Sequence, residues 1–221
     1  MYDVLAITNH NLCKNDFLEQ IKKICILNSE IKKLNSSKNF NINISIKSQN
    51  YNLNNMGSIS IVLREKDLSE KEYETLAIKV IKICKEYDTD CIIHTYYNIA
   101  KKLGLKKVHL SLKTLKDNPE LISEFHTIGV SIHSIEDAFE AQSLGASYIT
   151  AGHIFDTDCK KGIPGRGLVF LSNIINSVNI PVFAIGGICS SNIKCVLEIG
   201  SSGVCIMSGL MTINNPQNFF R

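Results

Sequence analysis

The chain has 221 residues, of which 44% are hydrophobic and 20% are charged. These proportions are close to globular averages and exclude bulk disorder, and the length suits one α/β barrel or, alternatively, two small domains. The net charge of +3 is small and the lysines are scattered, which excludes the concentrated positive surface that nucleic-acid binding requires.

Short apolar runs rich in β-branched residues recur along the chain, each followed by a stretch with helical periodicity. They cover residues 4–8, 59–63, 91–93, 108–110, 128–132, 148–150, 181–185 and 203–207. Apolar runs of this length without alternation fit strands that are buried on both faces, as parallel sheets require. Because strands and helices alternate, the sequence predicts an α/β fold, a single-domain (β/α)8 TIM barrel over residues 1–221.

Capping signals mark the start of two of the intervening helices. Ser69 followed by Glu72 has the spacing of a capping box before a helix over residues 69–87. Ser134 and Asp137 open a second helix in the same way, and Gly145 follows its end. These signals place the helices between the predicted strands, as right-handed crossovers require.

Two regions interrupt this regular alternation. Residues 28–57 form an Asn-rich insertion before the second strand, without a clear helix signal. Within it Phe40, Ile42, Ile44 and Ile46 alternate with polar residues, which is consistent with either an extra half-buried strand or a loosely ordered surface segment. After residue 209 few residues remain, so we expect a short last helix and a barrel seam that a partner subunit covers, in a homo-oligomer such as a dimer.

The eight cysteines favour reduced thiols rather than a disulfide framework. No Cys-x-x-Cys pair occurs, and Cys84, Cys91 and Cys205 lie in apolar runs, where a thiol behaves as a small hydrophobe. No signal peptide is recognised, and no apolar stretch reaches the roughly 18–20 residues that a membrane span needs. We therefore expect a cytoplasmic protein without a membrane partner.

Glycine-containing turns follow the last two predicted strands. In a TIM barrel the active-site groups lie at the carboxyl ends of the strands, and the loops after strands seven and eight often bind phosphate. Here these loops begin with Gly186-Gly187 and Ser208-Gly209. Glycine lets the backbone approach phosphate oxygens, and amides at a helix start donate hydrogen bonds to an anion. The two turns together predict a phosphate site.

Charged and imidazole side chains follow other strands. The second strand ends in Arg64-Glu65-Lys66-Asp67, which is either an anion-binding corner or a solvated charge cluster at a helix start. The fifth strand ends at His133, and histidine is well suited to proton transfer near neutral pH, although a lone histidine at a strand end is more often structural.

The long Gly-rich segment 152–167 is expected to cover a ligand, with Thr157 and Lys160 available for anion contacts. His94 and His153 also follow strands, so three imidazoles with His133 raise the question of zinc. No ligating carboxylate is apparent nearby and no His-x-x-x-His pair occurs, so we expect no metal and no cofactor.

The segments 152–167 and 180–188 resemble the thiamine-phosphate-synthase/TenI superfamily, and the similarity extends from residue 4 to residue 209 except for the insertion. The run Gly-His-Ile-Phe-Asp-Thr-Asp-Cys-Lys-Lys-Gly is similar to the thiazole tautomerase (TenI) branch. This resemblance implies an isomerase of thiamine biosynthesis that aromatises a thiazole carboxylate phosphate. It also implies that His133 is the acid/base and that Gly187, Ser208 and Gly209 match the phosphate turn.

The resemblance leaves two alternatives open. Thiamine phosphate synthase, a transferase, joins a pyrimidine diphosphate to a thiazole phosphate, and Arg64 and Lys66 match its diphosphate contacts. That branch holds Mg²⁺ with carboxylates after strands three and four, where this chain has His94-Thr95-Tyr96 and Leu110-Ser-Leu-Lys113. The other alternative is a non-catalytic, metabolite-binding regulator, although no helix-turn-helix pattern indicates DNA binding.

Overall fold

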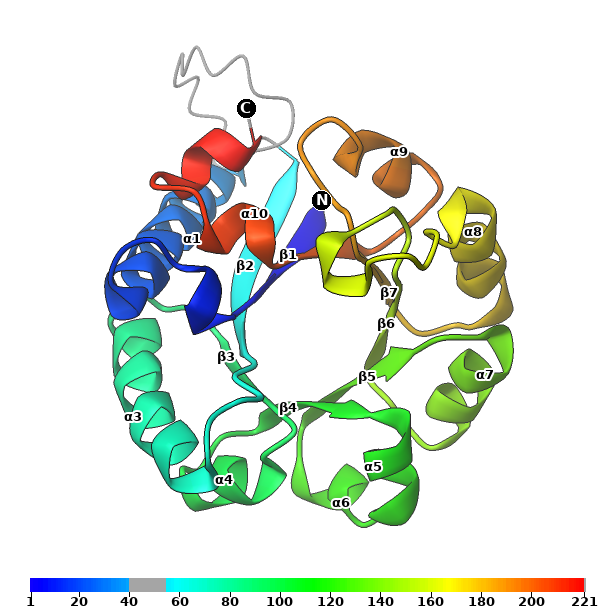
Figure 1. Ribbon diagram of the computed structural model, residues 1–221, viewed down its shortest axis with the longest axis horizontal. Helices are drawn as coiled ribbons and strands as arrows, with labels where there is room; N and C mark the ends of the chain where they lie inside the picture. The colour runs from blue at the N-terminus through cyan, green and yellow to red at the C-terminus, as the bar shows by residue number, and fades with distance from the viewer. Residues whose placement is uncertain (40–54, 221) are drawn as a thin grey trace.

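The computed structural model describes residues 1–39 and 55–220, and its eight strands close into one parallel barrel in sequence order. Figure 1 looks down this barrel, with the strands at the centre and the helices around them. The strands are β1 (Tyr2–Ile7), β2 (Met56–Leu63), β3 (Cys91–His94), β4 (Lys107–Ser111), β5 (Thr127–Ile132), β6 (Tyr148–Gly152), β7 (Val182–Ile185) and β8 (Gly203–Ile206). The predicted (β/α)8 barrel and its eight strands are confirmed.

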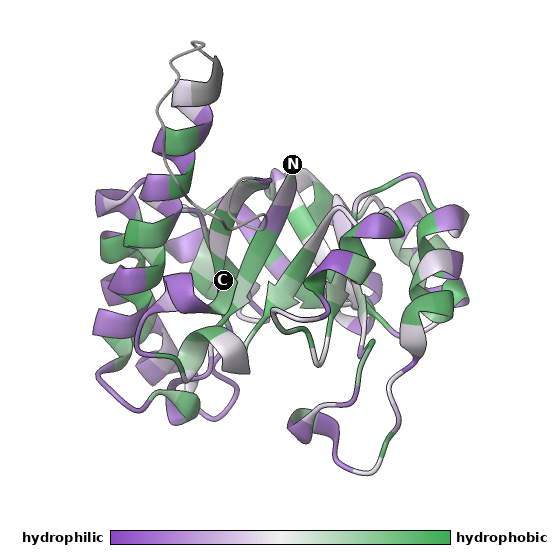
Figure 2. Ribbon diagram, turned by 90° about the horizontal axis from the view of Figure 1, so that it is seen from above, coloured by the Kyte–Doolittle hydropathy of each residue, from purple (hydrophilic) through white to green (hydrophobic). Residues whose placement is uncertain are grey.

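Helices follow each strand and cover the outside of the barrel. They are η1 (His10–Leu12), α1 (Phe17–Asn39), α3 (Glu70–Glu86), α4 (Tyr97–Lys102), α5 (Leu112–Asp117), α6 (Leu121–Glu124), α7 (Ile135–Ser143), η2 (Asp158–Lys160), α8 (Gly167–Ser177), α9 (Ile193–Glu198), α10 (Ser208–Met211) and η3 (Pro216–Phe220). Figure 2 shows mainly apolar strands and helices that mix polar and apolar residues. Among the described helices none combines the length and apolar character that crossing a membrane would take.

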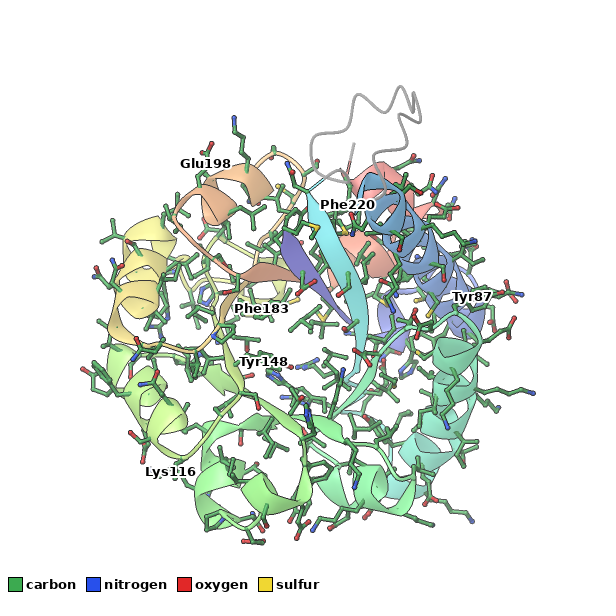
Figure 3. All side chains as sticks on the ribbon, turned by 180° about the vertical axis from the view of Figure 1, so that it is seen from behind. Tyr87, Lys116, Tyr148, Phe183, Glu198 and Phe220 are labelled. Carbon is green, nitrogen blue, oxygen red and sulfur yellow. The ribbon has the colours of Figure 1, made fainter. Side chains whose placement is uncertain are left out.

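Both faces of the strands are buried, in two separate apolar clusters. The larger cluster fills the space between strands and helices, and the smaller one lies inside the barrel. Tyr148 and Phe183 are the large side chains of the inner cluster, with ring centroids 5.3 Å apart, and both point toward the barrel centre in Figure 3. This filling occupies the inside of the barrel below the carboxyl ends of the strands.

The predicted helix caps are present. The Ser69 side chain accepts a hydrogen bond from the Glu72 backbone N–H while the Glu72 side chain accepts from the Ser69 backbone, which is the reciprocal capping box. The Ser134 side chain accepts from the Asp137 backbone N–H at the start of α7. Gly145, at φ +89°, takes the left-handed conformation that ends this helix.

The Asn-rich insertion is shorter than predicted, because α1 continues to Asn39 and β2 begins at Met56. The asparagines of α1 make tertiary contacts: Asn35 Nδ2 donates to the Met56 and Gly57 carbonyls, 2.9 and 3.1 Å away. These contacts compensate for the weak helix propensity. They also place the end of α1 beside the start of β2, at the opposite end of the barrel from the strand carboxyl ends. The alternating residues 40–46 lie outside the described residues.

The short last helix is confirmed, but the seam that it leaves is covered by the chain itself. After α10, η3 packs against α1, and Leu210, Met211 and Phe220 are almost completely buried. The expected reason for a partner subunit, an uncovered seam, is therefore wrong. The oligomeric state stays a prediction.

Candidate functional site

A cavity of about 740 Å³ opens at the carboxyl ends of the strands, and every strand contributes to its wall. Both apolar and polar side chains line it. The lining includes Ile7, Arg64, Glu65, Lys66, His94, His109, Ser111, Ser131, His133, Thr150, Gly152, His153, Thr157, Lys160, Ile185, Gly186, Gly187, Cys205 and Ser208. Of the nine predicted site residues, only Gly209 is missing from this wall.

The two predicted phosphate turns lie side by side. Ile185 on β7 pairs with Cys205 on β8, and Gly187 and Ser208 both line the cavity just beyond these strands. Gly209 instead packs beneath Phe219, since a Cβ there would lie 2.2 Å from the ring. Ser208 is therefore the side chain of the β8 turn that faces a ligand.

The glycines of the β7 turn are also needed by the neighbouring loop. Gly186 and Gly187 have φ values of +97° and +66°, which side-chain-bearing residues rarely adopt. A Cβ on Gly187 would lie 2.5 Å from the Asp156 carbonyl oxygen and 2.7 Å from the Phe155 Cβ. Substitution of Gly187 would therefore disturb folding, so Ser208 is the better position for a test of the predicted phosphate site.

The loop after β6 borders the cavity, and its Thr157 and Lys160 are part of the wall. Thr157 caps η2 by accepting from the Cys159 backbone N–H. Within the loop, the Asp156 carboxylate accepts from the Gly165 backbone N–H at 2.7 Å, and His153 Nε2 donates to the Ile163 carbonyl at 3.1 Å. His153 is thus part of the loop's internal hydrogen bonding.

His133 lies at the end of β5, at the mouth of the cavity, with its side chain exposed. Its backbone N–H donates to Asp137 Oδ2 at 2.8 Å, which fixes the residue at the start of α7. Its Nδ1 is 3.3 Å from the Gly152 carbonyl oxygen. Because a carbonyl can only accept, this contact favours the neutral tautomer with the proton on Nδ1, which leaves the Nε2 lone pair free to take a proton.

Arg64 and Lys66 form a basic corner at the end of β2. Neither makes an ion pair with another described residue. Burial, followed by the nearby Arg64 charge, lowers the pKa of Lys66. Glu65, between them, is 2% exposed and turns toward β1, where it accepts from the Thr8 hydroxyl and from the His10 backbone N–H at 2.9 Å. Arg64 and Lys66 are therefore available to an anionic ligand.

Two stacked imidazoles lie next to this corner. The His94 and His109 rings, from β3 and β4, are 5.5 Å apart at an interplanar angle of 22°. His109 is not predictable from the sequence pattern, because it lies within an apolar run and points inward only through the strand register. His109 Nε2 is 2.8 Å from Ser131 Oγ, and Nδ1 is 3.1 Å from Tyr148 Oη.

Among the described residues, one group of possible metal ligands lies close together: His10, Glu65 and Asp67 place ligand atoms within 4.8 Å of one another. It includes none of the three imidazoles considered for zinc in the sequence, which are His94, His133 and His153. The hydrogen bonds of the group are internal: His10 Nδ1 lies 2.8 Å from Glu65 Oε2, and Asp67 accepts from Asn11 Nδ2 at 2.8 Å. This group fixes η1 against the β2 corner.

Residues 43–210 match the family model described as thiamine monophosphate synthase, TMP-TENI. The chain belongs to the TMP-TENI family. Curated relatives of this TMP-TENI chain include the thiamine-phosphate synthases of Fusobacterium nucleatum, 40% identical over 71% of this chain and 77% of the relative, and of Clostridium acetobutylicum, 38% identical over 71% and 75%. A thiamine phosphate pyrophosphorylase from Pyrococcus furiosus shares the fold at a TM-score of 0.71, with 24% identity over 99% of this chain and 91% of that one.

Proposed function

We propose that this protein is a thiazole tautomerase of thiamine biosynthesis, acting on a thiazole carboxylate phosphate. The proposal rests on the residues that line the cavity. They include the Gly187 and Ser208 turns and an exposed His133, whose Nε2 has no hydrogen-bond partner among the described residues. Glu65 is the single carboxylate among the described lining residues. This set suits proton transfer on a bound phosphate ester. Family membership supports a role in thiamine biosynthesis.

The reaction moves one proton and needs no other reactant. The substrate carries an exocyclic double bond, and His133 Nε2 removes the proton from the ring carbon that bears the carboxylate. The electron pair shifts through the ring to the exocyclic carbon, which takes a proton back from the resulting imidazolium. Aromaticity of the product drives the reaction, so the protein's task is to hold the phosphate and place the ring beside His133.

We expect His133→Asn to lower turnover of the exocyclic thiazole by about 10²–10⁴-fold, because one proton-transfer group typically contributes this much. The measurement is the rate of aromatic product formation by ultraviolet absorbance or NMR, with circular dichroism to show that the fold is intact. His126→Asn is the matched control, since His126 is exposed and is not among the cavity-lining residues. Wild-type turnover in His133→Asn would remove this residue from the mechanism.

Thiamine phosphate synthesis is the second candidate, and the names of the most similar curated relatives favour it. That reaction releases diphosphate and uses Mg²⁺, which prefers oxygen ligands in octahedral geometry. The described cavity wall offers His94 and Ser111 at the ends of β3 and β4, and its carboxylate, Glu65, already accepts from Thr8 and His10. These residues do not fit a magnesium ion.

A coupled assay separates the two candidates. The protein is given a pyrimidine diphosphate and a thiazole phosphate, with and without Mg²⁺, and thiamine phosphate is measured by chromatography. We expect no product in either condition. Metal-dependent product would make synthesis the function, whereas tight thiazole phosphate binding with neither activity would indicate a metabolite-binding regulator.

A further inference from the structure

His94 has one ring nitrogen committed to the protein and one facing the cavity. Nδ1 is 2.6 Å from the Thr95 hydroxyl, and the ring stacks on His109. Nε2 makes no hydrogen bond with any residue in the described ranges, although the side chain lines the cavity. Because His109 is fixed by Ser131 and Tyr148, the His94 ring has a rigid support on one side. His94 is therefore placed to offer Nε2 to a ligand.

The groups that face His94 are positive or neutral. Arg64 and Lys66 follow β2, His109 lies on β4, and Tyr73 of α3 donates its hydroxyl to the Leu63 carbonyl. Burial, then His109, Arg64 and Lys66, lowers the pKa of His94 to about 2. The imidazole is therefore neutral near pH 7 and a poor proton acceptor. It can still donate a hydrogen bond, with Nδ1 accepting from Thr95 and the proton on Nε2.

The basic corner has no ion-pair partner among residues 1–39 and 55–220. Glu65 is held by the β1 side and Asp67 by Asn11, so neither carboxylate pairs with Arg64 or Lys66. Arg64 is half-buried and Lys66 is exposed, and both line the cavity, where their charges attract an anionic ligand. The turns after β7 and β8 form another part of the cavity wall. An anion at the corner and a phosphate at the turns would therefore occupy two different positions.

We propose that His94 determines specificity for a ligand with two anionic groups: it donates a hydrogen bond from Nε2 to the second group, which Arg64 and Lys66 bind at the same corner. This inference rests on the proposed function, in which the second group is the carboxylate on the thiazole ring. The neutral His94 donor orients the bound anionic group through a directional hydrogen bond, without adding a third positive charge at the corner. The phosphate turns then hold one end of the ligand and the corner the other, with the ring between them beside His133.

The test compares two probe ligands by isothermal titration calorimetry: the aromatic thiazole carboxylate phosphate and the same thiazole phosphate without the carboxylate. We expect wild-type protein to bind the carboxylated probe more tightly. In His94→Leu we expect the ratio of the two affinities to fall about tenfold, because one hydrogen bond to a charged group is lost. Binding of the probe without the carboxylate should be unchanged. His94→Gln, which keeps a donor, should retain most of the preference, and His126→Gln is the surface control.

Nitrogen NMR of the wild-type complex provides a test that needs no variant. We expect the His94 imidazole to stay neutral, with its proton on Nε2, from pH 5.5 to pH 8. An imidazolium in the complex, or a carboxylate preference that survives in His94→Leu, overturns the inference. If His94→Leu loses the preference but the wild-type protein has no tautomerase activity, only the proposed function is overturned. If the wild-type protein turns over the thiazole but its preference does not depend on His94, only the inference is overturned.

Discussion

The buried imidazole of His109 makes the stability of the protein sensitive to acid. The side chain is 3% exposed, and burial lowers its pKa from 6.5 to about 4. In the unfolded chain the imidazole takes up a proton near pH 6.5, whereas in the folded chain it does so only near pH 4. The free energy of unfolding therefore decreases as the pH falls through this window, by about 3 kcal/mol.

The corresponding variant is His109→Gln, which cannot be protonated but can still donate and accept hydrogen bonds. We expect the wild-type protein to lose stability relative to this variant by about 3 kcal/mol between pH 7 and pH 4. Urea denaturation at a series of pH values measures the difference, and taking the difference cancels the titration of the carboxyl groups. Parallel stability curves for the two proteins would show that His109 titrates normally in the folded state.

Single site residues can be predicted from the sequence where they follow a strand, because the loops after the strands form the active site of a TIM barrel. His133, Ser208, Arg64 and Lys160 were proposed because each follows a strand, and all four line the cavity. His109 was missed because it lies inside a strand, where only the barrel register decides whether a side chain points to the cavity or to the helices. Glu65, His10 and Thr8 come together across β1 and β2, a contact that no local pattern encodes.

At the level of elements, the anchoring of α1 depends on buried asparagine. Asn28 is fully buried; its Oδ1 accepts from the Ile59 backbone N–H at 2.8 Å, and its Nδ2 donates to Thr89 Oγ1 at 3.0 Å. One side chain thus joins α1 to β2 and to the loop before β3. Removing it leaves a buried strand N–H without a partner, which costs free energy beyond the lost contact.

We expect Asn28→Ala to lower the free energy of unfolding by about 2–4 kcal/mol, because a hydrogen-bonded buried side chain is lost and a backbone donor is left unsatisfied. Asn173→Ala is the control: Asn173 is exposed on α8, so a change within about 0.5 kcal/mol is expected. Chemical denaturation measures both. Equal effects of the two substitutions would show that Asn28 does not anchor α1.

The strands were easier to predict than α1 for a physical reason. A strand buried on both faces needs a continuous apolar run, which is visible in the sequence, and all eight were found with boundaries within a few residues. The second half of α1 has few apolar residues, and its stability comes from Asn28 and Asn35 bonding to other elements. Tertiary contacts of this kind override local helix propensity and cannot be inferred from composition.

At the level of the whole molecule, barrel closure brings together residues that are far apart in sequence. β8 pairs with β1 as well as β7, so the Ser208 turn lies between the β7 turn and the end of β1. The ligand site is therefore built by the ends of the strands, and phosphate binding can be tested at the β8 turn.

We expect Ser208→Ala to weaken binding of the thiazole phosphate about tenfold, because the hydroxyl is the donor that the β8 turn offers to a phosphate oxygen. Ser208 is exposed at the mouth, so its replacement by alanine should leave folding unchanged, unlike a substitution at Gly187. Ser143→Ala, at an exposed position on α7, is the control. Calorimetry with the phosphorylated and the dephosphorylated thiazole separates the phosphate contribution from that of the ring. If Ser208→Ala binds both ligands like the wild type, and a crystal soaked with sulfate holds the ion only between Arg64 and Lys66, the phosphate lies at the β2 corner. The ligand would then be reversed in the barrel, with its ring carboxylate toward β7 and β8.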